Sequence, residues 1–197
     1  MHANAILPAS TGLPAYCRYC GQRTELLVPS GDNRLRQCCN HCGAIHYDNP
    51  KLVLGTLPIW EDKVLLCKRA IEPRLGYWTL PAGFMENEES TAQAAQRETA
   101  EEAGAQIELL DFYTLISVPH ISQIHGFYRA RLLSPIFEPG EETLDARLFS
   151  EAEIPWENIA FRTVKLTLEH FFADRRAGQH YPFRTLDIIG PPPWASP

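Results

Sequence analysis

The chain has 197 residues, of which 45% are hydrophobic, which is enough for one domain of ordinary size and a small appendage. Its net charge of −6 argues against a whole-surface nucleic-acid binder, because such domains usually carry a marked basic excess. No apolar run approaches the length of a membrane span, and residues 1–15 lack the basic segment and apolar core of a secretory signal. We therefore expect a cytoplasmic protein with neither a membrane nor a nucleic acid as partner.

Two Cys-x-x-Cys-Gly sequences form the first organised unit. They are Cys17-Arg-Tyr-Cys20-Gly and Cys39-Asn-His-Cys42-Gly, with eighteen residues between them. Four thiolates at this spacing suit a tetrahedral structural Zn²⁺, and each glycine lets backbone amides turn toward the sulfurs. The alternatives are two disulfides, which a reducing cytoplasm disfavours, and a redox pair, which would need a following strand and helix. The pattern predicts a zinc ribbon over residues 14–47, after an N-terminal tail at residues 1–13.

The neighbouring residues refine this prediction. Cys38 is adjacent to Cys39 and could in principle replace it, but the doubled spacing favours Cys39 and leaves Cys38 and Cys67 as ordinary thiols. Residues 26–28 and 34–37 are expected as two short strands between the cysteine pairs. A unit this small has almost no core, so we expect the metal to drive its folding.

A second domain is expected over residues 48–180. The turn-rich Asp48-Asn-Pro50 junction marks its beginning. Residues 52–59 and 63–68 are apolar and β-branched enough to predict a pair of buried strands. Residues 78–83 then lead the chain into a loop that precedes a helix.

This helix is predicted over residues 90–103. Ser90, followed three residues later by Gln93, indicates a capping box, and Gly104 stands where a C′ glycine would end the helix. One narrow face carries small side chains that allow close packing on a sheet, namely Ala92, Ala95, Thr99 and Ala103.

Three carboxylates project from an adjacent face of the same helix. Glu98, Glu101 and Glu102 are related as i, i+3 and i+4, so they gather in one patch. Such a run repels itself and is commonly only a solvated acidic surface. Arg97 beside it can orient the carboxylates, and hard oxygen ligands on a rigid element are what Mg²⁺ or Mn²⁺ binding needs. The pattern therefore favours a divalent-metal site that bridges to substrate phosphates.

The same stretch resembles the Nudix box, Gly-x5-Glu-x7-Arg-Glu-U-x-Glu-Glu-x-Gly-U, in which U is usually a bulky aliphatic residue. The two U positions hold the smaller residues Thr99 and Ala105. All seven fixed positions match, at Gly83, Glu89, Arg97, Glu98, Glu101, Glu102 and Gly104. A chance acidic helix would not carry this set at these spacings, so residues 49–176 are identified as similar to Nudix hydrolases.

The resemblance implies a ligand set for the metal. Glu98 and Glu102 would be the principal ligands, and Glu101 a further or water-bridged one. The carbonyl group of Ala82, which stands just before the box glycine, would add another ligand.

The resemblance also implies the supporting roles. Glu89 would orient Arg97, which in turn would hold the ligand carboxylates in place. The general base in this family is often a glutamate from a later loop, and the Pro-Gly-Glu141-Glu142 sequence supplies two candidates. We favour Glu142 as the general base, with a simple solvated turn as the alternative.

The remaining elements complete the expected fold. Strands are predicted at residues 106–118, 126–133 and 144–149, and an amphipathic helix packed on the sheet at residues 161–172. This order predicts an α/β sandwich with a mixed sheet between helices, which is also the Nudix fold. Prolines crowd residues 191–197 and indicate an extended, Pro-rich C-terminal tail over residues 181–197.

The metal pattern and the resemblance together predict hydrolysis of a phosphoanhydride. The partner would be a nucleotide-derived small molecule, a nucleoside diphosphate linked to another moiety. Similar ADP-ribose pyrophosphatases carry a proline about fifteen residues beyond the box, where this chain has Pro119. Zinc-ribbon members that cleave NADH carry Ser-Gln-Pro-Trp-Pro-Phe, which is absent from residues 117–125. Because residues 45–50 resemble the junction of ADP-ribose and FAD pyrophosphatases, these are the expected substrates.

A second hypothesis belongs to a different class. A Nudix domain can serve as a regulatory or binding module that senses a nucleotide metabolite, with the ribbon engaging a partner. A degenerate box would favour such a sensor, whereas this box retains every catalytic glutamate, so an enzyme is preferred. Similar pyrophosphatases are often homodimers, but no residue pattern here requires a dimer.

Overall fold

The computed structural model describes residues 15–178 and 180–190, and the chain divides into two compact units after Asn49. The expected N-terminal tail and the terminal prolines lie outside the described residues. No helix in the described part is long and apolar enough to cross a membrane.

The first unit contains a three-stranded antiparallel sheet. Its strands are β1 (Glu25–Leu27), β2 (Arg36–Cys38) and β3 (Ile45–His46), in the order β1-β2-β3. The two expected strands are confirmed as β1 and β2. The strand β3 has only two residues, which is too short for an alternating hydrophobic pattern to predict it. The three hydrophobic clusters of the described residues all lie in the second unit. The ribbon sheet therefore forms without a core of its own, and apolar side chains such as Leu26 and Leu35 are exposed.

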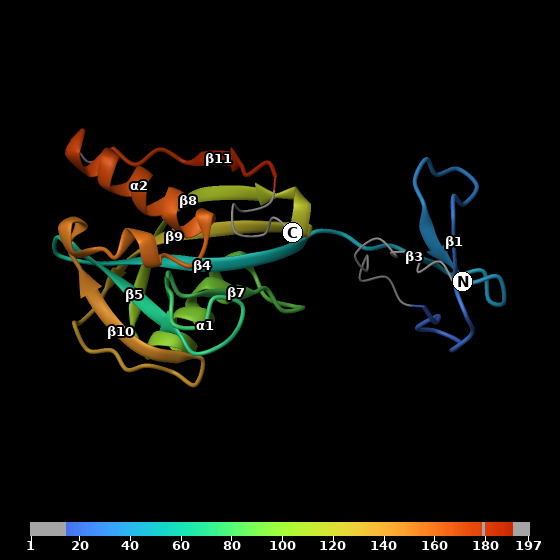
Figure 1. Ribbon diagram of the computed structural model, residues 1–197, viewed down its shortest axis with the longest axis horizontal. Helices are drawn as coiled ribbons and strands as arrows, with labels where there is room; N and C mark the ends of the chain where they lie inside the picture. The colour runs from blue at the N-terminus through green and yellow to red at the C-terminus, as the bar shows by residue number, and fades with distance from the viewer. Residues whose placement is uncertain (1–14, 179, 191–197) are drawn as a thin grey trace, which may run out of the picture. The chain divides into compact units, whose positions relative to one another are not determined.

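The second unit is built on a mixed eight-stranded sheet between two helices (Figure 1). The strands run in the order β10-β5-β4-β9-β8-β11, with β6 paired to β5 and β7 paired to β4. The pairs β4–β9 and β8–β11 are parallel, and the others are antiparallel. The expected α/β sandwich with a mixed sheet is confirmed. The strand bounds are β4 (Lys51–Trp60), β5 (Lys63–Arg69), β6 (Trp78–Thr79), β7 (Ala82–Phe84), β8 (Ile107–Val118), β9 (Gln123–Leu132), β10 (Thr143–Phe149) and β11 (Arg184–Asp187).

The helix α1 (Thr91–Ala103) begins and ends where its capping residues predict. The Ser90 side chain accepts a hydrogen bond from the Gln93 amide at 3.2 Å, and the Gln93 side chain accepts one from the Ser90 amide at 2.8 Å. Gly104 takes the left-handed conformation with φ 57°, and its N–H donates to the Ala100 carbonyl. These bonds satisfy backbone groups that the helix ends would otherwise leave unpaired.

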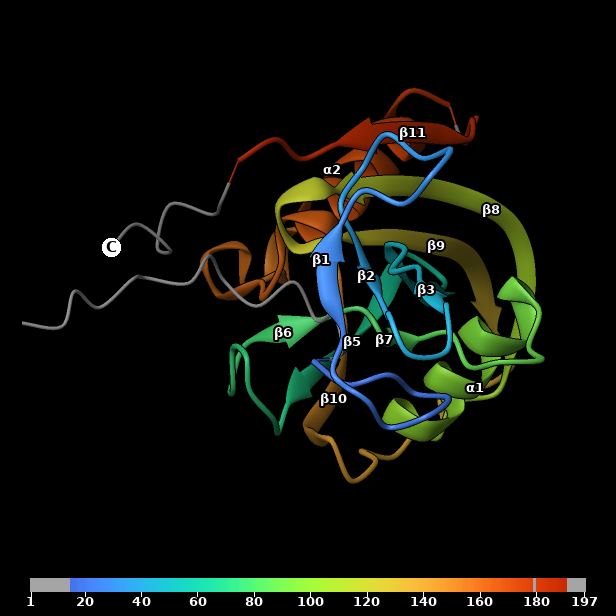
Figure 2. The same ribbon diagram turned by 90° about the vertical axis from the view of Figure 1, so that its right-hand side faces the viewer.

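Three of the four residues predicted for the small face of α1, Ala95, Thr99 and Ala103, are buried, whereas Ala94 is buried in place of the half-buried Ala92. Ala94 and Ala95 form a buried cluster with Leu54 of β4. The opposite face of the sheet is covered by α2 (Arg162–Arg176), shown from two sides in Figures 1 and 2. Its apolar side chains join the largest cluster of the structure, and these are Val164, Leu168, Phe171 and Phe172. Three short 3₁₀ turns complete the unit, at Pro119–Ile121, Glu151–Glu153 and Trp156–Asn158.

Residues 184–187, expected within an extended tail, instead form the edge strand β11. The Arg184 guanidinium donates to both carboxylate oxygens of Asp174 on α2, at 2.7 and 2.5 Å, and the Tyr113 hydroxyl donates to the same carboxylate at 2.7 Å. Burial raises the pKa of Asp174, but these bonds outweigh it and hold the pKa below its ordinary value. This paired charge ties β11 to α2 and β8, a contact across sequence distances that a local pattern cannot show.

Thr99, at the first U position of the box, belongs to a buried pair of hydroxyl groups. The hydroxyl oxygens of Thr99 on α1 and Thr56 on β4 are buried and 2.7 Å apart, and the Thr99 hydroxyl also donates to the Ala95 carbonyl at 2.8 Å. The Thr56 hydroxyl therefore donates to Thr99. Two complementary polar side chains replace the usual bulky aliphatic contact between helix and sheet, so the small residue leaves the packing intact.

We predict that Thr99→Val lowers the free energy of unfolding by about 1–3 kcal/mol, because it leaves the buried Thr56 hydroxyl without its acceptor. Thr56→Val should cost less, because Thr99 keeps its bond to Ala95. The double variant should recover most of the loss, since both polar groups are then replaced by methyl groups of similar size. Urea denaturation of the three variants, with the exposed Thr185→Val as control, measures these differences. Strictly additive costs of the two single substitutions would contradict this account.

Candidate active site

A cavity of about 840 Å³ opens beside α1, β4, β7 and β9 in the second unit. Its wall includes Arg69, the one arginine or lysine among the described residues that line it. The same wall carries seven carboxylates, which are Glu72, Glu86, Glu98, Glu101, Glu102, Glu141 and Glu142. The excess of negative charge suits a site that takes up cations before it can accept a phosphate.

Glu102 is the buried member of this group, with 9% of its surface exposed. Its Oε2 accepts a hydrogen bond from the Ala82 amide of β7 at 3.1 Å. Burial raises the pKa of Glu102 to about 8, and the Glu98 and Glu142 carboxylates add to this shift against the effect of the Ala82 amide and Arg69. The charged form of this side chain is therefore disfavoured unless further positive charge lies beside it. A divalent cation offers the positive charge that the pocket lacks.

Arg97 connects the helix face to the loop before it. Its Nε and Nη2 donate to the two oxygens of Glu89, at 2.6 and 3.0 Å. Its Nη1 donates to Glu98 at 2.6 Å and to Glu101 at 2.9 Å, and Nη2 also donates to the Phe84 carbonyl at 3.1 Å. One guanidinium thus contacts three carboxylates and the backbone of β7. This geometry suits the expected role of Glu89 and Arg97 in holding the carboxylates.

Gly83 allows Glu98 to lie against the backbone of β7. A Cβ atom at this position would come within 2.3 Å of Oε1 of Glu98. Any side chain there would force the Glu98 carboxylate to move from its present position. The box glycine is thus required by the position of the carboxylate, whereas Gly104 is required by its backbone conformation.

The loop that carries Glu141 and Glu142 is packed against the end of α1. The Gly140 amide donates to the Glu102 carbonyl at 3.0 Å, and a Cβ atom on Gly140 would lie 1.7 Å from the Glu101 carbonyl oxygen. Both glutamates reach the cavity wall. The Glu142 charge raises the pKa of both Glu98 and Glu102, although burial is the larger cause for each. Its role as general base stays a prediction.

The sequence did not predict four of the residues on the cavity wall as site residues, namely Arg69, Gln123, His125 and Phe161. Arg69 ends β5, donates from Nε to the Pro73 carbonyl at 2.9 Å and lies over the Phe161 ring at 5.0 Å. Gln123 and His125 enter from β9. Arg69 and Phe161 are 92 positions apart, and no catalytic or metal-binding motif includes either of them, so only the fold identifies them as neighbours.

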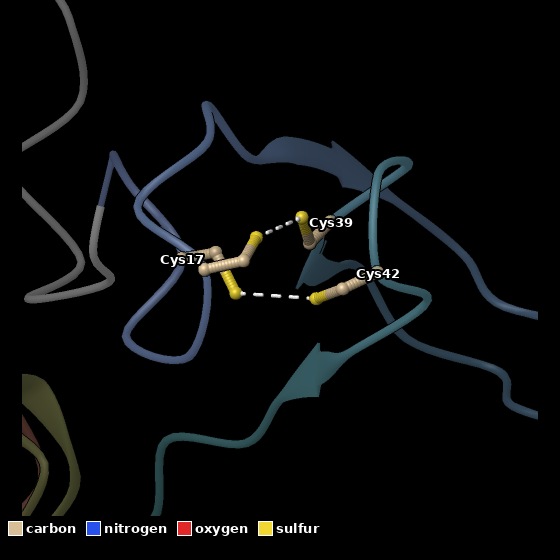
Figure 3. Close-up of side chains that lie close together, drawn as sticks. Cys17, Cys39 and Cys42 are labelled. Atoms are coloured by element: carbon tan, nitrogen blue, oxygen red, sulfur yellow. Dashed lines mark hydrogen bonds between the residues drawn. The ribbon is translucent and has the colours of Figure 1, made fainter.

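The four predicted zinc ligands lie together in the first unit. The sulfur atoms of Cys17 and Cys42 are 3.6 Å apart (Figure 3). Those of Cys20 and Cys39 are 3.5 Å apart. All four sulfurs lie within 4.8 Å of one another. Backbone amides of Cys42 and His41 lower the pKa of Cys39 to about 6, whereas burial and the neighbouring thiols raise the pKa of Cys20 to about 12 against the effect of the Gln22 amide. The turn therefore favours the thiolate form at Cys39 in particular.

Cys38 and Cys67 do not belong to this group. Both are buried free thiols, with Cys38 in β2 and Cys67 in β5 of the second unit. The spacing argument therefore chose correctly between Cys38 and Cys39. The four thiols fit a structural zinc ion.

Two family models match the chain. The model described as NUDIX domain matches residues 50–168, and the zinc-ribbon model described as Nudix N-terminal matches residues 15–48. A solved structure of a NUDIX hydrolase from Nitrosomonas europaea is 50% identical, covers 88% of this chain and 98% of its own, and has a TM-score of 0.85. An ADP-ribose pyrophosphatase from Streptococcus suis is 26% identical, with 71% and 100% covered and a TM-score of 0.56.

Curated relatives include the NAD-capped RNA hydrolase NudC of Haemophilus influenzae (strain PittGG). It is 30% identical over 169 residues, which cover 78% of this chain and 60% of NudC. The chain thus spans less than two thirds of the length of that relative. A NudC of Pseudomonas aeruginosa is 29% identical over 169 residues, which cover 59% of its length.

We predict one zinc ion per chain in protein purified without chelators, and its loss in Cys39→Ser. The Cys38→Ser variant is the matched control, because it removes the adjacent thiol and should keep full zinc content. Elemental analysis measures the metal, and limited proteolysis should show that zinc removal loosens residues 14–47 while the second unit stays intact. Zinc-free protein, or zinc lost from Cys38→Ser and kept by Cys39→Ser, would refute the assignment.

Proposed function

The chain belongs to the Nudix family, and from this membership we propose that it is a divalent-metal-dependent hydrolase of the pyrophosphate in a nucleoside diphosphate linked to another moiety. ADP-ribose or FAD is the proposed substrate. The observation that carries the proposal is the buried Glu102 among other carboxylates, in a cavity large enough for a small-molecule ligand. A merely solvated acidic surface would not bury one of its carboxyl groups in this way.

Glu98, Glu102 and the Ala82 carbonyl would hold Mg²⁺ or Mn²⁺, with Glu101 as a further or water-bridged ligand. Such a cation, when bound, neutralises phosphate charge and lowers the pKa of a coordinated water. Arg97 keeps Glu98 and Glu101 in position through the bonds that it donates, and Glu89 in turn fixes Arg97.

The chain's other groups act on the substrate and the water. Arg69 has its Nε bonded to Pro73 and its plane over Phe161, so its terminal N–H groups can donate to the pyrophosphate oxygens. Glu142 accepts the proton of the attacking water, whose oxygen bonds to phosphorus. The bond from that phosphorus to the bridging oxygen breaks, and two phosphate monoesters leave.

The choice of substrate depends on two relatives that point in different directions. The Streptococcus suis relative, described as an ADP-ribose pyrophosphatase, supports ADP-ribose. The NudC relatives, described as hydrolases of NAD-capped RNA, support an NAD-type substrate and leave nucleic acid open as a partner. Residues 117–125 lack the signature of NADH-cleaving members, so we favour ADP-ribose or FAD. The sensor hypothesis remains the alternative from another class.

A substrate panel tests this choice. Purified protein with excess Mg²⁺ should show its highest kcat/KM on ADP-ribose or FAD among ADP-ribose, FAD, NADH, NAD-capped RNA, nucleotide sugars and diadenosine polyphosphates. Because cleavage is at the pyrophosphate, AMP should appear as a product from ADP-ribose and FAD. A higher kcat/KM on NADH or on NAD-capped RNA would overturn the substrate assignment and leave the hydrolase assignment standing.

Glu102→Gln tests the hydrolase itself. The amide oxygen can still accept the Ala82 bond, so folding should be unchanged or slightly more stable in this crowded, negatively charged site. The amide provides no anionic ligand, so kcat should fall on the order of a hundredfold or more, equal to roughly 2.7 kcal/mol of transition-state stabilisation.

The control is Glu88→Gln, which changes an exposed glutamate one position before Glu89 and should alter neither kcat nor the melting temperature. A Glu102→Gln protein with near-native kcat would show that the acidic face takes no part in catalysis. If the native protein binds ADP-ribose and hydrolyses nothing on the panel, the sensor hypothesis replaces the enzyme.

A further inference from the structure

A chain of hydrogen bonds links the first turn of α2 to the cavity wall. The Thr163 hydroxyl on α2 lies 3.1 Å from Nδ1 of His125, and Nε2 of His125 lies 2.9 Å from Oε1 of Gln123. Thr163 is buried, and both His125 and Gln123 line the cavity. None of these residues belongs to the box.

The partners determine which atoms donate. A neutral imidazole has one N–H group and one bare nitrogen. The Gln123 oxygen can only accept, so Nε2 carries the hydrogen, and bare Nδ1 accepts from the Thr163 hydroxyl. Burial lowers the pKa of His125 to about 4, so the ring stays neutral at physiological pH.

This arrangement fixes the orientation of the Gln123 amide. Its oxygen is occupied by His125, which leaves its NH₂ group with two hydrogens to donate. No other described residue takes a hydrogen bond from this group. A half-buried histidine and a buried threonine thus keep this amide in one orientation.

The sheet register places this amide away from the carboxylates. Val53 of β4 is paired with Phe84 of β7 on one side and with His125 of β9 on the other. Two strand spacings, about 10 Å, therefore separate His125 from the β7 segment that contacts Glu98 and Glu102. The cavity wall also includes the apolar residues Val53, which is paired with His125, and Ile121, two positions before Gln123.

We propose that Gln123 is a specificity-determining residue that donates its amide hydrogens to a neutral acceptor on the moiety attached to the pyrophosphate, with His125 and Thr163 as positioning residues. A sugar hydroxyl oxygen or a carbonyl or ring nitrogen of a base has the required chemistry. The inference deepens the proposed function and rests on it, because it assumes that the pyrophosphate lies at the carboxylates.

The kinetic test compares Gln123→Leu with the native protein on the best substrate of the panel. Loss of a bond made equally in the ground and transition states raises KM and leaves kcat unchanged. We expect KM to rise about tenfold and kcat to stay within about twofold. Gln106→Leu, an exposed glutamine outside the cavity, is the matched control and should leave both constants unchanged.

The positioning residues are tested by a pair of substitutions. Thr163→Val removes the hydroxyl that fixes the His125 ring and should raise KM severalfold, while Thr163→Ser keeps the hydroxyl and should restore the native KM. A purely structural role for Thr163 would instead change the melting temperature and leave the split between KM and kcat unaffected.

The ring tautomer gives a readout that needs no catalysis. Nitrogen-15 NMR of His125 should show a protonated Nε2 and a bare Nδ1. A protonated Nδ1 would mean that Gln123 presents its oxygen to the cavity, and it would overturn the inference.

The kinetic outcomes distinguish a failure of this inference from a failure of the proposed function. A native KM in a folded Gln123→Leu protein would also overturn the inference while the hydrolase assignment stands. A native protein that hydrolyses nothing on the panel would refute the proposed function, and the inference with it.

Discussion

The second unit depends on one constraint, which is the concentration of glutamate carboxylates along the wall of a single cavity. Glu102 is buried beside Glu98 and Glu142, and burial together with these neighbouring carboxylates raises its pKa. Like charges at such close quarters would push the helix face and the loop apart. Packing of the helix and the loop therefore brings the carboxylates together, and electrostatic repulsion between them opposes this packing.

The surrounding backbone makes this crowding tolerable. Arg97 contacts three carboxylates at once, so its single positive charge offsets repulsion among those that are not deeply buried. Because Gly83 and Gly140 have no side chain, β7 and the later loop can approach the helix closely. The capping box and the Thr99–Thr56 pair hold α1 on the sheet, so these contacts keep their register. The site that we propose to bind a cation is thus preorganised by interactions that do not involve the cation.

The first unit meets a different constraint. Its described residues form no hydrophobic cluster, and several of its apolar side chains are exposed. Four thiols within 4.8 Å of one another take the place of a core, since metal–thiolate bonds can supply folding energy that so small a unit cannot obtain by burial. On our proposal the two units use metals for different purposes, the first for its fold and the second for its reaction.

What the sequence by itself determined were features that depend on short spacings. The limits of α1 follow from Ser90, Gln93 and Gly104, the grouping of its three glutamates follows from the helical period, and the choice of Cys39 over Cys38 follows from the repeated Cys-x-x-Cys-Gly pattern. The mixed sheet was expected from the order of strands and helices together with the family resemblance. Only the tertiary structure decided the rest: the burial of Glu102, the strand at residues 184–187, the place of Arg69 on the cavity wall, and the bonds from Thr163 through His125 to Gln123. These depend on desolvation and on contacts between residues far apart in the chain, and a local pattern carries no information about either.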